Sequence, residues 1–260
     1  MAVLGGPLLA VVLWFFDKTG KLAWLYAWGI VIAFQLTVMF LAPILIMPLF
    51  NRFTPLPEGE LKKAIEGYAK SQDFKLKGIF TMDGSKRSSK SNAFFTGFGK
   101  FRRIVLYDTL VANHSVDQLV AIVAHEMGHF KQKHIHKMVL LATISMGIMF
   151  YILSHFLNNK NLFAAFGMDH LSVYASLIFF SFLYSPLSTS FSIFMNFLSR
   201  KFEFQADHFA RQSGGGPGPL DAALKKLSSD NLTNLTPHPL KVFWDYSHPP
   251  VLERIRALTR

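Results

Sequence analysis

The sequence predicts a mainly α-helical protein with several membrane spans, and this prediction rests on its composition and on the spacing of its charged residues. Of the 260 residues, 51% are apolar, 15% are aromatic and only 17% are charged, and each share is shifted from soluble averages toward membrane proteins. Four stretches carry no Lys, Arg, Asp or Glu, at residues 3–16, 22–50, 138–157 and 171–198. Because an α-helix needs about 20 apolar residues to cross a bilayer, we expect three full spans and a first, shorter one.

The basic residues give the expected orientation of these spans. Lys and Arg outnumber Asp and Glu by 27 to 16, and nearly all of them lie in residues 51–137 and 199–260. Two spans separate these segments, so both fall on one side of the membrane, and an excess of cations favours the cytoplasmic side. No nucleic-acid recognition motif accompanies the net charge of +11. We therefore expect the lipid bilayer as a partner and no nucleic acid.

The segments between the spans predict a small cytoplasmic-side α+β part. Residues 60–70 have the spacing of an amphipathic helix, while residues 78–82 and 103–107 have the pattern of short strands. We divide the chain into membrane spans at 1–50, a cytoplasmic-side segment at 51–137, two spans at 138–198 and a cytoplasmic-side C-terminal segment at 199–260. The sequence contains no cysteine, which excludes disulfides and thiolate metal ligands.

Residues 125–129 read His-Glu-Met-Gly-His, which is the H-E-x-x-H pattern of a zinc-binding helix. On a helix, residues i and i+4 share a face, so His125 and His129 can each offer an imidazole nitrogen to one zinc ion. Glu126, next to the first of them, can act as general base toward the attacking water. We therefore expect a zincin-like metal-binding helix that holds one zinc ion per chain.

The sequence around the motif predicts the helix that the motif requires. Ser115 and Gln118 form a capping box, and apolar residues follow at helical spacing. Apart from glycines, no helix breaker interrupts residues 116–157, so we expect the metal helix to continue into the third span. The metal site should then lie near the cytoplasmic membrane boundary. On such a helix, His134 and His136 would be interfacial or solvated.

A catalytic zinc needs a third protein ligand and an open coordination position. Glu203 is the best candidate, because it lies a little over one turn past the fourth apolar stretch, at the same membrane face. Asp207 follows one turn later on the same helix face. It could accept the free N–H of a ligand histidine and so fix the tautomer of that ring. The alternative is that both carboxylates form a solvated acidic edge.

With both halves of the site in place, the sequence closely resembles the M48 family of integral membrane metallopeptidases, and within it the Ste24 or CAAX prenyl protease branch. The resemblance runs from about residue 22 to the C-terminus, in separated blocks that keep their order. The blocks are Phe-Asn-Arg-Phe-Thr-Pro-Leu-Pro-Glu-Gly-Glu at 50–60, Ser-Asn-Ala-Phe-Phe-Thr-Gly-Phe-Gly at 91–99, Arg-Ile-Val-Leu-Tyr-Asp-Thr at 103–109, the zinc motif, residues 203–207 and Tyr-Ser-His-Pro-Pro-Val-Leu-Glu-Arg at 246–254.

The resemblance implies that His125, His129 and Glu203 bind zinc and that Glu126 is the catalytic acid/base. It also implies roles for residues that carry no strong signal by themselves.

Asn92 and His248 would flank the metal and contact the substrate, and His248 could donate a hydrogen bond to the oxyanion of the tetrahedral intermediate. Without the resemblance, His248 in its His-Pro-Pro turn would be interpreted as structural. Arg256, two residues past the last block, is a further candidate for orienting carboxylates near the site.

The resemblance also implies an activity, namely zinc-dependent cleavage of peptide bonds near the C-terminus of CAAX-type, prenylated or similar membrane-associated substrates. The protein would be an integral protein of the bacterial inner membrane or the ER membrane, with its active site facing the cytoplasm or near that boundary. Ste24 proteases look like proteins with seven spans, whereas this sequence offers four. We therefore expect that the N-terminal spans of the family are missing from this sequence. Two alternatives are an HtpX-like quality-control protease of misfolded membrane proteins and a non-catalytic fragment that acts as a membrane scaffold.

Overall fold

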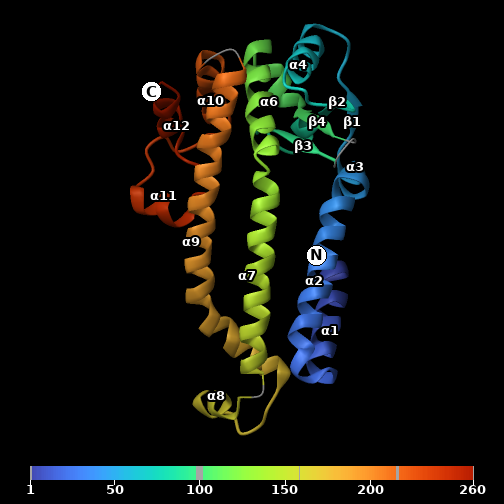
Figure 1. Ribbon diagram of the computed structural model, residues 1–260, viewed down its shortest axis with the longest axis vertical. Helices are drawn as coiled ribbons and strands as arrows, with labels where there is room; N and C mark the ends of the chain where they lie inside the picture. The colour runs from blue at the N-terminus through green and yellow to red at the C-terminus, as the bar shows by residue number, and fades with distance from the viewer. Residues whose placement is uncertain (1, 98–101, 158, 215–216, 260) are drawn as a thin grey trace. The chain divides into compact units, whose positions relative to one another are not determined.

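A computed structural model of the chain describes residues 2–97, 102–157, 159–214 and 217–259 (Figure 1). The chain forms two compact units, and each combines segments that are distant in the sequence. The first unit comprises the residues up to Met39 together with His136–Ser192, and the second comprises Phe40–Ile135 together with Ile193–Arg260. The two basic segments of the sequence therefore fold almost entirely into the same unit.

Long helices account for most of the first unit. They are α1 (Ala2–Lys18), α2 (Ala23–Leu41), α7 (His134–Phe156) and α9 (Val173–Ser213), with the short η1 (Gly20–Leu22) before α2 and the short α8 (Lys160–Ala165) before α9. Past α2, the chain continues in the second unit through a π-helical turn, η2 (Ala42–Ile46), and α3 (Met47–Phe50).

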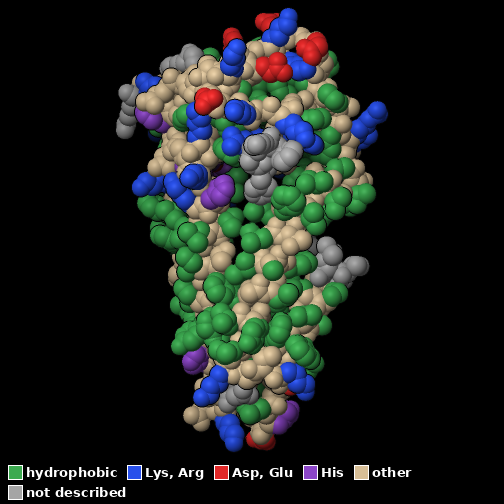
Figure 2. Space-filling model, turned by 45° about the vertical axis from the view of Figure 1, so that its right-hand side comes forward, with side chains coloured by type: hydrophobic (Ala, Val, Ile, Leu, Met, Phe, Trp, Pro, Cys, Tyr) green, Lys and Arg blue, Asp and Glu red, His purple; other side chains and the backbone are tan. Residues whose placement is uncertain are grey.

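Among the described residues, three helical segments are long and apolar enough to cross a membrane, namely Gly20–Phe50, His134–Phe156 and Val173–Ser213. The first apolar stretch of the sequence forms α1, whose 17 residues fall short of the about 20 that a span needs. The long helices expose large hydrophobic side chains, among them Tyr174 and Phe182, and Figure 2 shows few charged side chains in that region. Apolar surface on this scale is suited to contact with lipid.

The first unit has a small core of its own. Its buried members are Val12, Ala27, Phe150, Leu153, Leu157 and Phe180. Trp28 joins two of its helices, because the indole Nε1 donates a hydrogen bond of 3.0 Å to the Thr143 carbonyl. Gly147 leaves the room that this ring needs, since a Cβ there would lie 3.0 Å from the Trp28 ring.

The second unit contains a four-stranded sheet in the order β1-β2-β4-β3. Its strands are β1 (Phe53–Pro55), β2 (Gly78–Met82), β3 (Ala93–Thr96) and β4 (Arg103–Tyr107). The central strands β2 and β4 are the two that the sequence predicts, and they pair in parallel. The outer strands β1 and β3 pair antiparallel with them. In the part of the chain that the structure describes, β3 is therefore an edge strand.

Besides η2, α3 and the ends of the long helices, the described residues of the second unit form seven further helical segments. They are α4 (Glu60–Ser71), η3 (Gly84–Lys86), α5 (Asp108–Asn113), α6 (Val116–Lys131), α10 (Pro217–Asp230), α11 (Pro239–Asp245) and α12 (Val251–Thr259). Alternate strand residues such as Ile79, Ile104 and Leu106 are buried in one core with Ile122 and Met127 of α6. This packing fixes α6 against one face of the sheet.

The metal helix does not continue into the third span, so that prediction is wrong. Helix α6 ends at Lys131 and α7 begins at His134. Between them Lys133 takes a positive φ of 56°, a left-handed conformation that ends a helix. The residues between the two helices include neither Gly nor Pro, so the sequence pattern does not indicate that the helix ends here. As a result His134 faces away from solvent and is buried.

Candidate metal centre

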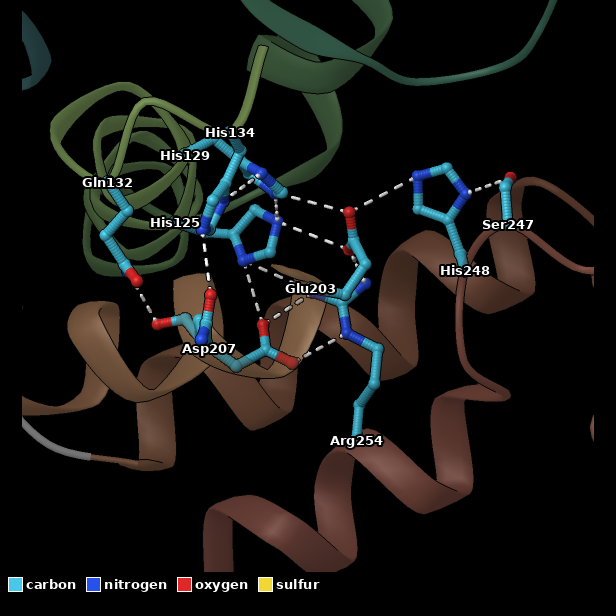
Figure 3. A network of polar contacts seen from close by, with 10 residues as sticks. His125, His129, Gln132, His134, Glu203, Asp207, Ser247, His248 and Arg254 are labelled. Atoms are coloured by element: carbon cyan, nitrogen blue, oxygen red, sulfur yellow. Dashed lines mark hydrogen bonds and ion pairs between the residues drawn. The ribbon is translucent and has the colours of Figure 1, made fainter. Parts of the chain in front are cut away.

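Helix α6 begins with a capping box and carries both histidines of the motif on one face. The Ser115 hydroxyl accepts from the Gln118 backbone N–H, while the Gln118 side chain accepts from the Ser115 N–H. Three turns further on, the Nε2 atoms of His125 and His129 lie 3.1 Å apart. The helix therefore presents two imidazole nitrogens to a single point (Figure 3).

Glu203 comes to the same point from α9. Its Oε1 lies 3.2 Å from His129 Nε2, and its Oε2 lies 3.5 Å from His125 Nε2. Zinc bonds of about 2.0–2.1 Å at tetrahedral angles would place ligand atoms about 3.3 Å apart. The three separations of 3.1–3.5 Å fit that geometry, and two imidazoles with one carboxylate are a donor set of catalytic zinc sites. These residues could hold a zinc ion.

The close approach of α9 to α6 depends on Gly128 of the motif. A Cβ at this position would lie 3.0 Å from the Ala206 Cα and 3.1 Å from the Ala206 carbonyl oxygen. Both of those atoms are backbone and cannot rotate away. A glycine between the two ligand histidines therefore allows the helix that carries Glu203 to reach them.

Asp207 and Arg254 hold one of the ligand histidines. Asp207 Oδ1 lies 2.8 Å from His125 Nδ1, so it can accept a hydrogen bond from the N–H of that nitrogen and leave Nε2 free for a metal. The Arg254 guanidinium donates two hydrogen bonds to the Asp207 carboxylate, at 2.6 and 2.8 Å, and lies 3.2 Å from Glu203 Oε2. Sequence reasoning assigned this role to Arg256. The structure instead brings Arg254 to the carboxylates and leaves Arg256 exposed, because residues two apart on a helix point about 200° apart.

His134 supports the other ligand histidine, which the sequence did not reveal. Its Nδ1 lies 3.1 Å from His129 Nδ1, and its Nε2 lies 3.0 Å from Gln205 Oε1. The ring also stacks on Phe202, with centroids 4.2 Å apart. His134, predicted to be interfacial or solvated, is buried, so the solvated alternative is wrong for it. His136 is exposed, in agreement with the solvated alternative. The only sequence signal was a third histidine five residues after the motif.

Burial and the charges of the site shift the pKa values of two α6 residues, His125 and Glu126. Burial disfavours protonation of His125, but the carboxylates of Asp207 and Glu203 outweigh it and raise the pKa of this imidazole to about 9. Burial also raises the pKa of Glu126, although the neighbouring histidines oppose the shift. A carboxyl group with a raised pKa is better matched to proton transfer near neutral pH.

The ligand cluster opens into a cleft of about 500 Å³ that Glu126, Asn92 and His248 also line. His248 is 67% exposed, its Nε2 lies 3.5 Å from Glu203 Oε1, and its Nδ1 is 2.9 Å from the Ser247 hydroxyl. Asn92 is exposed immediately before β3. The structure thus brings seven of the eight residues singled out from the sequence to one cleft or its supports, and leaves out only Arg256.

Residues 55–260 of the chain match the family described as Peptidase family M48, and residues 1–52 match one described as CAAX prenyl protease N-terminal, five membrane helices. The chain belongs to peptidase family M48. Membership implies a metal cofactor, for which His125, His129 and Glu203 form the candidate site. With its matched membrane-helix region and three long apolar helices, this M48 chain is an integral membrane protein.

Curated relatives of this M48 chain agree with the CAAX prenyl protease branch. The CAAX prenyl protease 1 homolog of Oryza sativa subsp. japonica is 42% identical over 257 residues, covering 98% of this chain and 60% of the relative. CAAX prenyl protease 1 of Saccharomyces cerevisiae is 36% identical over 271 residues, with coverages of 98% and 60%. The crystal structure of S. mikatae Ste24p superposes with a TM-score of 0.91 at 36% identity, covering 100% of this chain and 64% of that one. The chain spans about 60% of the length of the curated relatives it matches.

Proposed function

We propose that the protein is a zinc-dependent endopeptidase of the membrane, with one zinc ion per chain, that cleaves peptide bonds near the C-terminus of CAAX-type prenylated or similar membrane-associated substrates. The observation that carries this proposal is the position of Glu126. Its carboxyl group lines the same cleft as His125 and Glu203, one residue after a ligand histidine. A structural metal site is closed by its protein ligands, so it does not need an additional, unligated carboxyl group beside it in an open cleft.

The proposed reaction is hydrolysis with Glu126 as general base and acid. Zinc, when bound, supplies a Lewis acid that polarises the scissile carbonyl and activates the attacking water. Glu126 takes the proton of that water and passes it to the leaving amine. His248, on the open side of the cleft, donates to the oxyanion as the carbonyl becomes tetrahedral. Asn92 binds the peptide beside the edge strand.

The branch of the family and the membrane helices support a lipid-bearing substrate. The named relatives are CAAX prenyl proteases, and a prenylated C-terminus is anchored in the bilayer that the long helices would cross. The active site would face the cytoplasm or lie near its membrane boundary, because the segments that carry it hold most of the Lys and Arg residues. A quality-control protease of the HtpX type would use the same chemistry on misfolded membrane proteins.

Replacement of the proposed base tests the chemistry. We expect Glu126→Gln protein, purified in detergent and loaded with zinc, to keep one zinc per chain and to lose cleavage of a farnesylated CAAX peptide by at least about 100-fold. The matched control is Glu66→Gln, the same change at an exposed residue of α4, which should cleave normally. Undiminished cleavage by Glu126→Gln with zinc bound would exclude this mechanism.

Two further measurements separate the alternatives. Wild-type protein offered the farnesylated peptide and an unfolded membrane protein should cleave the peptide first, whereas preferential cleavage of the unfolded protein would indicate the quality-control function. Metal analysis gives the zinc content of the same sample. A preparation that binds no stoichiometric zinc, or binds it and cleaves neither substrate, would indicate a non-catalytic scaffold.

A further inference from the structure

One edge of β3 has no neighbouring strand among the described residues, and the side chain of Asn231 occupies hydrogen-bonding groups at one end of that edge. The backbone N–H of Ser91 donates to Asn231 Oδ1 at 3.1 Å, and Asn231 Nδ2 donates to the Ser91 carbonyl at 3.4 Å. The carboxamide therefore makes the two hydrogen bonds with Ser91 that a residue of a neighbouring antiparallel strand would make. The two residues are 140 positions apart in the sequence.

Ser91 lies on the edge that a bound peptide would use. The Tyr107 backbone N–H donates to the Asn92 carbonyl at 3.0 Å, so Asn92 faces β4. Because the backbone groups of successive strand residues point to opposite sides, those of Ser91 and Ala93 face the other way. This is the edge of β3 that no strand of the described residues covers, and both residues line the cleft with His125.

Asn231 is held firmly in this position. It follows the last residue of α10, and its own N–H donates to the Leu227 carbonyl at 3.0 Å. The helix before it packs on α6 through the buried Leu220 and Leu224. The backbone of Asn231 is thus fixed to the same framework that carries the metal ligands, and its carboxamide is held by the two hydrogen bonds with Ser91.

Resting on the function proposed above, we infer that Asn231 sets how much chain a substrate can place beyond the scissile bond. Antiparallel pairing is the more stable arrangement for a peptide added to a strand edge. An antiparallel substrate runs from Phe95 toward Ser91, so its C-terminal residues point at Asn231. A substrate residue cannot pair with Ser91, because the Asn231 carboxamide already bonds to the backbone N–H and carbonyl of Ser91. The substrate therefore has to end at this point or leave the strand arrangement. Asn231 is a positioning and specificity-determining residue that favours substrates with a short C-terminal remainder.

The inference predicts a gain of binding when Asn231 is removed. The probes are a farnesylated CAAX peptide and the same peptide lengthened by two residues at its C-terminus, because strand residues two apart share an edge. Binding is measured in zinc-loaded Glu126→Gln protein in lipid nanodiscs, so that turnover does not interfere. We expect the longer peptide to bind at least about tenfold more weakly than the shorter one, since it cannot make two of its hydrogen bonds.

Adding Asn231→Ala should bring the two affinities to within about threefold, mainly by strengthening binding of the longer peptide. The matched control is Asn113→Ala, which removes a hydrogen bond to Asp230 at the end of α10 but none to Ser91, and it should keep the wild-type ratio. If the alanine variant does not fold, Asn231→Ser serves the same purpose.

An unchanged ratio in a folded Asn231 variant, or no binding of either peptide, would overturn the inference. Failure of the proposed function has a different signature, because it appears as absence of cleavage by protein with Glu126 intact.

Discussion

Among the residues that support the candidate metal ligands without binding the metal, Arg254 is the one whose replacement should lower stability and zinc affinity most. Its guanidinium is 12% exposed and contacts the carboxylates of Asp207 and Glu203, which are 3% and 6% exposed. Zinc can compensate the charge of Glu203, but it does not reach Asp207, whose oxygens are used by Arg254 and His125. Arg254→Ala therefore leaves a buried carboxylate with one partner fewer.

The magnitude follows from the cost of breaking a buried ion pair. Removing one partner costs about 3–5 kcal/mol, because the remaining charge stays desolvated. For a chain of this size, 1 kcal/mol corresponds to a shift of about 2–4 °C in the unfolding midpoint. We therefore expect Arg254→Ala to lower the midpoint by roughly 6–20 °C. Zinc affinity should fall about 10–100-fold, because Asp207 no longer orients His125 firmly.

The assay is thermal unfolding of detergent-purified protein followed by intrinsic fluorescence, with zinc affinity measured by competition against a chelator. The chain supplies its own control, since Arg256→Ala removes an exposed arginine from the same helix and should change neither quantity. Arg254→Lys should fall between the two, because an ammonium group cannot make the paired contacts of a guanidinium. If Arg254→Ala and Arg256→Ala behave alike, the proposed support of His125 through Asp207 is wrong.

Two of the other predictions concern residues around this network, and a third concerns the buried His114. His134→Ala should weaken zinc binding about 10–100-fold, whereas His136→Ala, a change at an exposed neighbour, should leave it unchanged. Zinc affinity is measured by competition with a chelator. Equal affinities of the two variants would contradict the proposal that His134 supports His129. Gly128→Ala should lower both the zinc affinity and the unfolding midpoint, because the new Cβ would lie 3.0 Å from the α9 backbone. The control is Gly67→Ala on the exposed face of α4, where no atom lies within 4 Å of the new Cβ, and it should raise stability by up to about 1 kcal/mol. Unchanged zinc affinity and midpoint in Gly128→Ala would show that the helices can separate freely. Burial lowers the pKa of His114 below its ordinary value of 6.5, so the folded chain resists a proton that the unfolded chain binds near that pH. The stability that neutral His114 provides is present above that pH and is lost as the pH falls below it. His114→Gln should flatten the decline of the unfolding midpoint below pH 6.5, and an equally steep decline would refute the assignment.

Local sequence signals predicted the elements that depend on local rules. The capping box at Ser115 and the apolar spacing after it located the start of α6. Strands β2 and β4 appeared as mainly apolar runs because both are central strands of the sheet. The outer strands were missed for the opposite reason. β1 has three residues and ends in Pro55, and β3 is half exposed, so neither shows a strong alternating pattern.

The supports of the metal ligands depend on contacts that the sequence does not display. The left-handed Lys133 turns His134 into the site, although lysine has no special preference for that conformation. The choice between Arg254 and Arg256 depends on the rotation of a nine-residue helix about its own axis, which only tertiary packing decides. Asn231 belongs to the same class, since its partner Ser91 lies 140 residues away.

These supports converge on a single segment of α9. Glu203 offers its carboxylate directly to the metal position, Asp207 holds His125, and Gln205 reaches the other ligand imidazole through His134. Three side chains within five residues of one helix thus provide one candidate ligand and orient the other two. The same helix runs from Val173 to Ser213 with Pro186 inside it, and its length and composition make it one of the candidate spans. Because the three side chains lie so close together on one helix, a local shift of this segment of α9 would move them together. Gly128 permits the close approach of this segment to α6, so it is the position where the placement of all three side chains can be altered without touching a ligand.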